Sequence, residues 1–154
     1  MGSATPVLRN VTVEDLTVIL SELDDFWQEG RDMGFLHQAL YVHEFAETSV
    51  LAERERRILG YLLGFVAPAG YGYIHAVGVR AAARGEGIGR LLYGRFAELA
   101  GAGGATSLKA ITAPENTDSR GFHAALGFSE NLVEGYSPSG GTRVVFRRRL
   151  NAQP

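Results

Sequence analysis

The middle of the chain holds three strand-like runs joined by very short connections, and this feature most narrows the range of folds. The runs lie near Ser49–Glu53, Ile58–Ala67 and Tyr73–Arg80. The charged segment Glu53–Arg57 (ERERR) and the turn APAGYG separate them. Because connections this short join antiparallel neighbours, the runs predict three consecutive antiparallel strands. We interpret the ERERR segment as a solvated hairpin tip.

Before this region, the sequence predicts one strand and two helices. Pro6–Thr12 alternates apolar and polar residues, as a strand does. Apolar residues then follow helical spacing from Val13 to Trp27, with Thr12 as the expected N-cap and Asp15 as its capping partner. A second amphipathic helix is expected from Phe35, in FLHQALYVHEFAE.

After it, the pattern predicts alternating helices and strands. A helix is expected over about Gly87–Ala100, then a strand over Ser107–Ala113 and a short helix that ends at Gly127. Two final strands, in FSENLVEGYS and TRVVFRRRL, should pair across PSGG. The apolar stripe of the helix expected over Gly87–Ala100 would consist of Ile88, Leu91, Leu92, Phe96 and Leu99. The order predicts an α/β (α+β) fold with a mixed, mainly antiparallel seven-stranded sheet flanked by about four helices.

Length and composition fit one soluble domain, which we expect to span residues 1–154. The 15 basic and 17 acidic residues give a net charge of −2, which argues against a nucleic-acid-binding surface. The chain has no cysteine, so it lacks disulfides and thiolate nucleophiles, and a reducing compartment is the simplest expectation. No apolar run is long enough to span a membrane and no secretory signal is evident, so we predict a cytoplasmic protein.

The segment RGEGIGR, Arg84–Arg90, combines three glycines with two arginines where a strand gives way to a helix. A helix N-terminus presents unpaired amides and the positive end of the helix dipole, and glycine allows an anion to approach the backbone. The segment therefore looks suited to a phosphate or pyrophosphate. A purely structural turn between strand and helix is the alternative.

Two common phosphate-binding motifs do not fit this segment. The nucleotide P-loop needs four residues between two glycines, followed by Lys and Ser or Thr. The dinucleotide fingerprint needs G-x-G-x-x-G near the first strand, whereas Gly85, Gly87 and Gly89 alternate strictly and follow several strands.

Arg84-x-x-Gly87-x-Gly89 resembles the R/Q-x-x-G-x-G/A signature of the GNAT acyl-CoA-dependent N-acetyltransferases. The later segment NTDSRGFHAALGF is similar to the family's N-x-x-S-x-x-F-Y-x-x-x-G-F segment, with Asn116, Ser119, Phe122, Gly127 and Phe128 in register. The predicted order of elements is also that of the GNAT fold along nearly the whole chain.

This resemblance implies transfer of an acetyl group from acetyl-CoA to a primary amine by direct attack, without a covalent enzyme intermediate. Main-chain groups around Val77 and Val79 would pair with the pantetheine arm and polarise the thioester carbonyl. Gly78, between them, would allow close approach or a bulge. The residues implied in coenzyme A binding are Val77, Val79, Arg84, Gly85, Glu86, Gly87, Ile88, Gly89, Arg90, Asn116, Ser119, Phe122 and His123.

His123 occupies the position where many family members have a tyrosine that protonates the leaving thiolate. An imidazolium is a competent donor in principle, so His123 is a candidate general acid. The alternative is a histidine that only lines the cofactor channel or caps a helix turn.

His75 is the candidate general base, directly or through water. It is expected to share strand parity with Val77 and Val79, and its offset from the signature resembles that of a catalytic histidine in the arylalkylamine branch of the family. A half-buried strand histidine is the alternative. Glu44 and Glu47 are rival bases or amine-attracting carboxylates, unless they are merely solvated.

The acceptor pocket is the least constrained part of the sequence. Trp27 either belongs to the core or lines this pocket, and the acidic residues Asp24, Asp25, Glu29 and Asp32 favour a cationic acceptor. His37 and His43 lie six residues apart, not at the spacing that places two metal ligands on one helix face, so no metal is expected.

The expected partners are a small-molecule or peptide amine and, since the family is often dimeric, a second copy of the chain, with neither nucleic acid nor membrane. Two alternatives to an acetyltransferase remain open at this point. One is the same scaffold with a longer acyl-CoA, and the other is an acyl-CoA-binding module with little or no turnover.

Overall fold

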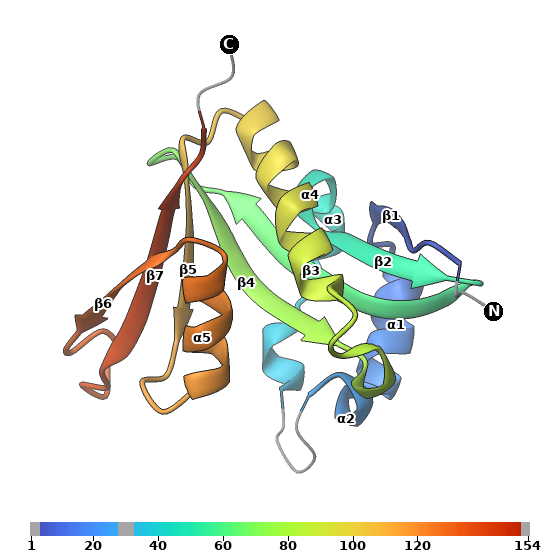
Figure 1. The fold of residues 1–154 in the computed structure, drawn as a ribbon, viewed down its shortest axis with the longest axis horizontal. Coiled ribbons are helices and arrows are strands. Elements are labelled where there is room, and N and C mark those ends of the chain that lie inside the picture. The colour runs from blue at the N-terminus through green and yellow to red at the C-terminus, as the bar shows by residue number, and fades with distance from the viewer. Residues whose placement is uncertain (1–3, 28–32, 152–154) are drawn as a thin grey trace.

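The fold is built on one sheet of seven strands in the order β1-β2-β3-β4-β5-β7-β6 (Figure 1). A computed structural model describes residues 4–27 and 33–151. Only the β4–β5 pair is parallel, and every other neighbouring pair is antiparallel. The strands are β1 (Val7–Asn10), β2 (Val50–Arg54), β3 (Arg57–Val66), β4 (Tyr71–Val79), β5 (Ser107–Thr112), β6 (Ser129–Val133) and β7 (Arg143–Arg149). The predicted mixed, mainly antiparallel sheet is confirmed.

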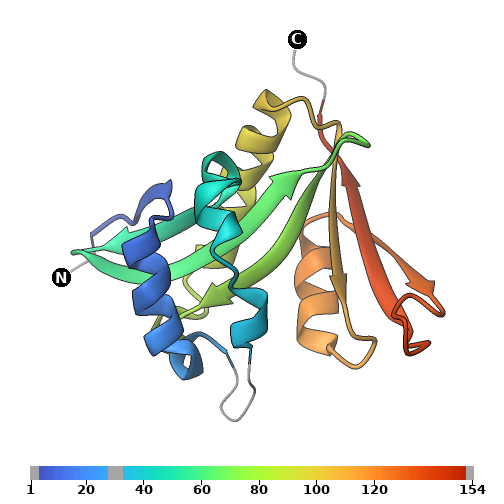
Figure 2. The same cartoon turned by 180° about the vertical axis from the view of Figure 1, so that it is seen from behind.

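Helices cover both faces of this sheet, as Figures 1 and 2 show from opposite sides. The helices are α1 (Val13–Ser21), α2 (Leu23–Phe26), α3 (Leu40–His43), α4 (Ile88–Ala102) and α5 (Thr117–Ala125). Short 3₁₀ turns η1 (Gly34–Leu36), η2 (Ala46–Thr48) and η3 (Ala81–Ala83) connect them. Helices α4 and α5 lie on one face, and α1, α2 and α3 lie on the other.

Each face has its own apolar cluster. The cluster under α4 is centred on Leu62, Leu92 and Phe96, none of which is accessible to solvent. The cluster under α1–α3 includes Ile19 and Tyr61, which are equally inaccessible. Strand β3 contributes to both clusters, because its successive side chains point to opposite faces.

The N-terminal helices differ from their predicted form. The helix expected over Val13–Trp27 ends at Ser21, and α2 begins at Leu23 after a break at Glu22. The amphipathic segment from Phe35 forms only α3, with η1 and η2 on either side. Apolar side chains from α1, α2, η1 and α3 pack into the same cluster, which a straight continuous helix would not permit.

Two smaller predictions concern the β2–β3 hairpin tip and the apolar stripe of α4. The hairpin tip consists of Glu55 and Arg56, both with positive φ, as a two-residue hairpin turn requires. In α4, Leu91 is 42% exposed, and Tyr93 is buried on the core side instead. The predicted apolar stripe was therefore wrong at Leu91.

Strands β4 and β5 pair only over their first four residues. The parallel pairing runs from Tyr71 opposite Ser107 to Ile74 opposite Ala110, and then it ends. Beyond this point the two strands diverge (Figure 1). The C-terminal half of β4 therefore has a strand neighbour on one side only, namely β3.

Candidate functional site

The turn from Arg84 to Gly87 leads into α4 in a conformation that needs glycine. Gly85 has φ of +82° and Gly87 has φ of +81°. A Cβ atom built at either position would meet nothing within 4 Å. The two glycines thus leave open space beside the main chain, on the outside of the turn.

The amides of this turn are free. No backbone hydrogen bond found in the described part of the chain uses an amide between Gly85 and Arg90, and the first bond of α4 runs from Leu91 N to Gly87 O. Gly87 is the N-cap residue and has no side chain with which to cap the helix. The positive end of α4 is therefore available to an anion.

The two arginines that flank the turn behave differently. Arg90 is exposed and makes no ion pair or hydrogen bond to any described residue. The Arg84 guanidinium instead donates to Val79 O at 3.3 Å and to Phe26 O at 3.2 Å. Arg84 therefore ties the end of α2 to the end of β4, and Arg90 supplies the free positive charge at the turn.

The second motif lies directly against the first. The Phe122 ring of α5 occupies the space beside Gly89, where a Cβ atom would lie 3.1 Å from it. Asn116 caps α5 by accepting a hydrogen bond from Ser119 N at 3.1 Å. The structure thus brings the two sequence motifs together through the contact between Gly89 and Phe122.

His123 is buried, and both of its ring nitrogens are used inside the protein. Nδ1 lies 2.7 Å from Ser119 O, a carbonyl that only accepts, so Nδ1 carries the proton. Nε2 then accepts from the Tyr93 hydroxyl at 2.7 Å. The ring is stacked on Phe146, with ring centroids 4.0 Å apart.

Burial lowers the pKa of His123, although the bond to Ser119 O partly opposes the effect. The imidazole is therefore neutral at pH 7, and its one N–H proton is already donated to a carbonyl. This arrangement offers no support for the role of general acid that the sequence suggested.

The main chain of β4 presents free hydrogen-bonding groups where β5 has diverged. Arg80 N donates to Leu59 O of β3. Because every second residue of an antiparallel pair is hydrogen-bonded to the partner strand, Gly78, two residues before Arg80, also bonds to β3. The N–H and C=O groups of the alternate residues Val77 and Val79 point the other way, toward the gap left by β5. Apart from the Arg84 bond to Val79 O, the described residues offer them no partner.

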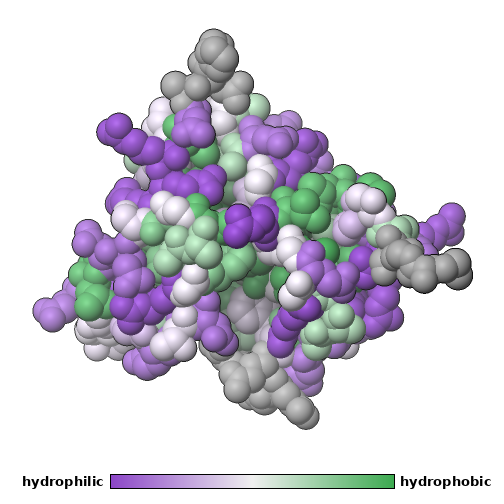
Figure 3. All heavy atoms as spheres, viewed as in Figure 1, coloured by the Kyte–Doolittle hydropathy of each residue, from purple (hydrophilic) through white to green (hydrophobic). Residues whose placement is uncertain are grey.

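Seen from the α4 and α5 side, hydrophobic residues lie between hydrophilic ones near the middle of the surface (Figure 3). The side chains of Val77 and Val79 are only partly buried and pack against the cluster under α4. This face therefore combines free main-chain groups with apolar side chains beside the open turn.

A β-bulge places His75 on the opposite face from Val77 and Val79. The pairing of β3 with β4 shifts between Leu63 and Gly64, so that His75 is an extra residue in β4. The His75 ring stacks on Tyr41 of α3 at 4.6 Å. The expected shared parity was therefore wrong, because an extra residue in one strand reverses the alternation of side chains.

The geometry of His75 leaves one ring nitrogen unoccupied. Nε2 lies 3.0 Å from Leu36 O and donates its proton there, and Nδ1 has no partner among the described residues. Burial lowers the pKa of His75, partly opposed by the bond to Leu36 O. A neutral imidazole with a free Nδ1 has the form that a general base requires.

A buried hydrogen-bond chain beside Gly78 was missed by the sequence analysis. Trp27 Nε1–H donates to the Tyr61 hydroxyl at 2.6 Å, and that hydroxyl lies 2.6 Å from His37 Nε2. His37 Nδ1 donates to Met33 O, so Nε2 accepts from Tyr61. Trp27 is thus half-buried and bonded to the core.

Gly78 is a glycine because the Tyr61 ring fills the place of its Cβ atom, at 2.9 Å. The close approach that the sequence predicted at Gly78 is therefore made by a side chain of the protein. Since Tyr61 and Gly78 are adjacent only across the sheet, no local pattern in the sequence indicates their contact.

Glu44 and Glu47 are exposed and lie far from the glycine turn. They line a hollow together with Leu99 and Ala102, near the C-terminal end of α4. The turn lies at the other end of this 15-residue helix, on the order of 20 Å away. The structure does not bring these carboxylates to the turn.

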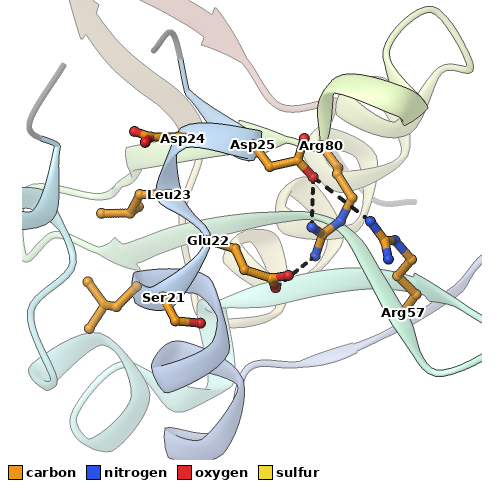
Figure 4. Close-up of a pocket in the computed structure, with 8 residues that line it drawn as sticks. Ser21, Glu22, Leu23, Asp24, Asp25, Arg57 and Arg80 are labelled. Atoms are coloured by element: carbon orange, nitrogen blue, oxygen red, sulfur yellow. Dashed lines mark hydrogen bonds and ion pairs between the residues drawn. The ribbon is translucent and has the colours of Figure 1, made fainter. Parts of the chain in front are cut away.

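The acidic residues of α2 line a hollow, and the basic residues Arg57 and Arg80 line the same hollow (Figure 4). The buried Arg80 guanidinium lies 2.8 Å from Asp25 and 3.4 Å from Glu22, and Arg57 is 4.0 Å from Asp25. The charge of Asp25 is thus compensated within the protein, which weakens the argument for a cationic acceptor. Glu29 and Asp32 lie outside the described residues.

The comparisons with known proteins agree with this geometry. The model of the Acetyltransferase (GNAT) family matches residues 16–128. The structure of Ard1 from Thermoplasma volcanium has a TM-score of 0.80 at 15% identity, covering 97% of this chain and 100% of that one. Naa20 from Chaetomium thermophilum, solved with a bisubstrate analogue, has a TM-score of 0.73 at 25% identity, covering 94% of this chain and 86% of that one.

A third similar structure was solved with its cofactor bound. This is yncA, a putative acetyltransferase from Salmonella typhimurium in complex with acetyl-CoA, with a TM-score of 0.71 at 18% identity, covering 97% of this chain and 96% of that one. Among curated protein sequences, none matches the chain. Within residues 4–27 and 33–151, no helix has the length and apolar character needed to cross a membrane.

Proposed function

Because the chain belongs to the GNAT acetyltransferase family, we propose that it transfers an acetyl group from acetyl-CoA directly to a primary amine. The observation that carries this proposal is the open N-terminus of α4, where six consecutive residues from Gly85 to Arg90 keep their amides free of backbone partners. The free N–H groups of Val77 and Val79 and the free C=O group of Val77 lie at the end of the strand that leads into this turn.

The residues present fit coenzyme A. The amides of the turn and the Arg90 guanidinium would hold the pyrophosphate, and the main chain of Val77 and Val79 would pair with the pantetheine arm. In this proposal Arg84 acts from behind the turn, through its bonds to Val79 O and Phe26 O. The proposed binding set also keeps Glu86 and Ile88 from the turn, Phe122 beside Gly89, and Asn116 and Ser119 at the N-terminus of α5.

When bound, acetyl-CoA supplies a thioester whose carbonyl is attacked by a neutral amine, with release of the thiol. We assign to His75 the removal of the amine proton, because its Nδ1 is unoccupied and its Nε2 is fixed by Leu36 O. The chain has no cysteine, which agrees with direct transfer in a ternary complex. His123 is assigned a positioning role, since its bonds join α4 to α5 through Tyr93.

The test is release of thiol from acetyl-CoA, measured across a panel of small amines and peptides. His75→Ala should lower kcat by about ten- to a thousandfold, the usual range for loss of a general base. The matched control is His43→Ala, which changes an exposed histidine on α3 and should leave kcat unchanged. An equal loss of activity in both variants would refute the assignment of His75.

The dependence of activity on pH gives a second test of the role of His75. A general base acts when neutral, and the pKa of His75 is lowered by burial. Activity that depends on His75 should therefore persist below pH 6.5 and fall only as pH drops through the lowered pKa. The variant His123→Phe should show the same fall of activity at low pH and should mainly raise KM for acetyl-CoA.

A second candidate function is an acyl-CoA-binding module with little or no turnover. The occupied nitrogens of His123 favour it, because they leave the position of the family's usual proton donor without a free proton. Tight binding of acetyl-CoA by calorimetry, together with no thiol release for any amine, would identify such a module.

A further inference from the structure

The face of the sheet opposite α5 carries a row of cations that no helix covers. Strand β5 pairs with β7 so that Lys109 lies opposite Arg147, and Ser107 lies opposite Arg149. Their neighbours Leu108, Ala110, Val144 and Phe146 belong to the cluster under α4 and α5. Since side chains alternate along a strand, Lys109, Arg147 and Arg149 all point to the other face.

Helices α1–α3 leave this part of the sheet uncovered. Their apolar cluster draws strand residues from β2, β3 and β4, and none of its members comes from β5, β6 or β7. In the view from behind, these helices lie in front of the β2–β4 part of the sheet, and no helix crosses in front of β5 and β7 (Figure 2).

The three cations, which we call the cationic strip, have no carboxylate partner among residues 4–27 and 33–151. The Lys109 ammonium lies 5.0 Å from the centre of the Tyr71 ring. Desolvation and the nearby Arg147 lower the pKa of Lys109, which agrees with two cations held close together without a counter-ion. Arginines at the opposite edge of the sheet do have carboxylate partners, as Arg9 does in Asp15 and Glu53.

The strip lies on the same face as the proposed base. Lys109 is opposite Tyr73 of β4, and Tyr73 and His75 both point away from α4. Val77 is four residues beyond Tyr73 along β4, a separation of about 13 Å at the rise of a strand. Tyr136, from the segment between β6 and β7, reaches this face and interacts with the Tyr73 hydroxyl.

We infer that the acceptor is the amino end of a polypeptide with acidic side chains shortly after its first residue, and that the cationic strip binds these carboxylates. An extended peptide whose amine lies beside Val77 covers about 13 Å with its next four residues, so roughly its third to fifth side chains reach Lys109 and Arg147. Arg149 lies two residues further along β7, opposite Ser107. This inference rests on the proposed function for the position of the amine.

The test compares peptides that differ only in charge. Peptides with a C-terminal fluorescein label, a free N-terminal amine and glutamate, glutamine or lysine at the third to fifth positions are titrated with the protein saturated with coenzyme A, which cannot transfer an acetyl group, and binding is followed by anisotropy. The glutamate peptide should bind about tenfold more tightly than the glutamine peptide at low salt, and the difference should shrink as salt screens the charges.

Single variants assign this preference to residues. Lys109→Gln and Arg147→Gln should each weaken binding of the glutamate peptide about two- to fivefold, the range for exposed ion pairs, and leave the glutamine peptide unaffected. The double charge reversal Lys109→Glu with Arg147→Glu should favour the lysine peptide. Arg95→Gln, which removes an exposed cation of α4, is the matched control and should change neither.

The outcomes separate the two proposals. Equal binding of the three peptides, or a preference that survives the double reversal, overturns the inference even if amines are acetylated. Absence of thiol release with every amine overturns the proposed function, whatever the peptides do. Tighter binding of a short single-stranded RNA through Lys109 and Arg147 would overturn the inference in favour of a nucleic-acid surface.

Discussion

The N-termini of α1 and α4 are built in opposite ways. At α1, Thr12 Oγ1 accepts from Asp15 N at 3.2 Å, and the Asp15 carboxylate accepts from Thr12 N at 2.8 Å. Arg9 adds two further bonds to this carboxylate, at 2.6 Å and 2.9 Å. At α4, the cap is Gly87, which offers no side chain, and no residue of the described chain takes its place.

The difference shows at which helix end this chain leaves main-chain N–H groups without a hydrogen-bond acceptor. Capping a helix with Ser, Thr, Asn or Asp in place of Ala contributes about 1 kcal/mol to stability. The chain makes that contribution at α1. At α4, the longest of its described helices, the glycine cap forgoes only roughly a few tenths of a kcal/mol, but it gives the amides no side-chain acceptor. An end that is left open beside main-chain groups of β4 is what the proposed binding of coenzyme A at this turn requires.

The largest expected effect is a loss of acetyl-CoA affinity when a side chain is added at the N-terminus of α4. Gly87→Ala forces a side chain into a left-handed conformation, at a cost of about 1–2 kcal/mol in unfolding free energy, and places a methyl group in the open space beside the amides. We expect the affinity for acetyl-CoA, measured by calorimetry, to fall about tenfold or more.

Gly94→Ala is the control for this change. Gly94 lies within α4 and has no atom within 4 Å of its Cβ position, so alanine there should raise stability by up to about 1 kcal/mol and leave binding unchanged. Unaltered affinity in Gly87→Ala would mean that the open end does not bind the cofactor.

The next largest effect is a loss of stability when the cap at the N-terminus of α1 is removed. Thr12→Ala removes the cap and should lower the free energy of unfolding in urea by about 1 kcal/mol, without change in acetyl-CoA affinity. Thr17→Ala, a change of the same size within α1, removes only a bond back to Val13 O and should cost little. A loss of acetyl-CoA binding in Thr12→Ala would break the contrast between the two ends.

The smallest effect is a change of stability with pH at α1. Burial would raise the pKa of Asp15, but the bonds from Arg9 and Thr12 outweigh it and hold the pKa below the ordinary value. A carboxyl group with a lowered pKa in the folded state stabilises the protein above its unfolded pKa of about 4. This contribution is lost as pH falls below about 4.

Urea unfolding between pH 3 and pH 6 measures this effect. Asp15→Asn should have a smaller slope of unfolding free energy against pH in this range than the unaltered protein. Equal slopes would show that the α1 cap does not depend on the charge of Asp15.

The features that the sequence predicted best depend on neighbours along the chain. The capping box spans only Thr12 to Asp15, and the turn from Arg84 to Gly87 is readable from glycine spacing. The three antiparallel strands followed from connections too short for any other arrangement. The division of the first helix at Glu22 was missed, because Glu22 and Asp25 are drawn to Arg80, more than fifty residues away in sequence.

The roles of the two histidines could not be read from their motifs. His123 stands in register with a catalytic tyrosine, yet its nitrogens are taken by Tyr93, thirty residues away, and by Ser119. His75 was expected beside Val77 and Val79, and the bulge turns it to the other face. In both cases the chemistry depends on contacts that form only when distant strands and helices pack.

The sequence by itself determined the type of fold, the open glycine turn and the family, because periodicity, turn residues and capping pairs act over a few neighbouring residues. Tertiary structure alone decided that His75 keeps a free ring nitrogen and His123 does not, which arginine of the glycine turn remains unpaired, and which face carries the cationic strip. These properties follow from strand register and buried hydrogen bonds, and the single extra residue in β4 is enough to turn His75 to the other face of the sheet.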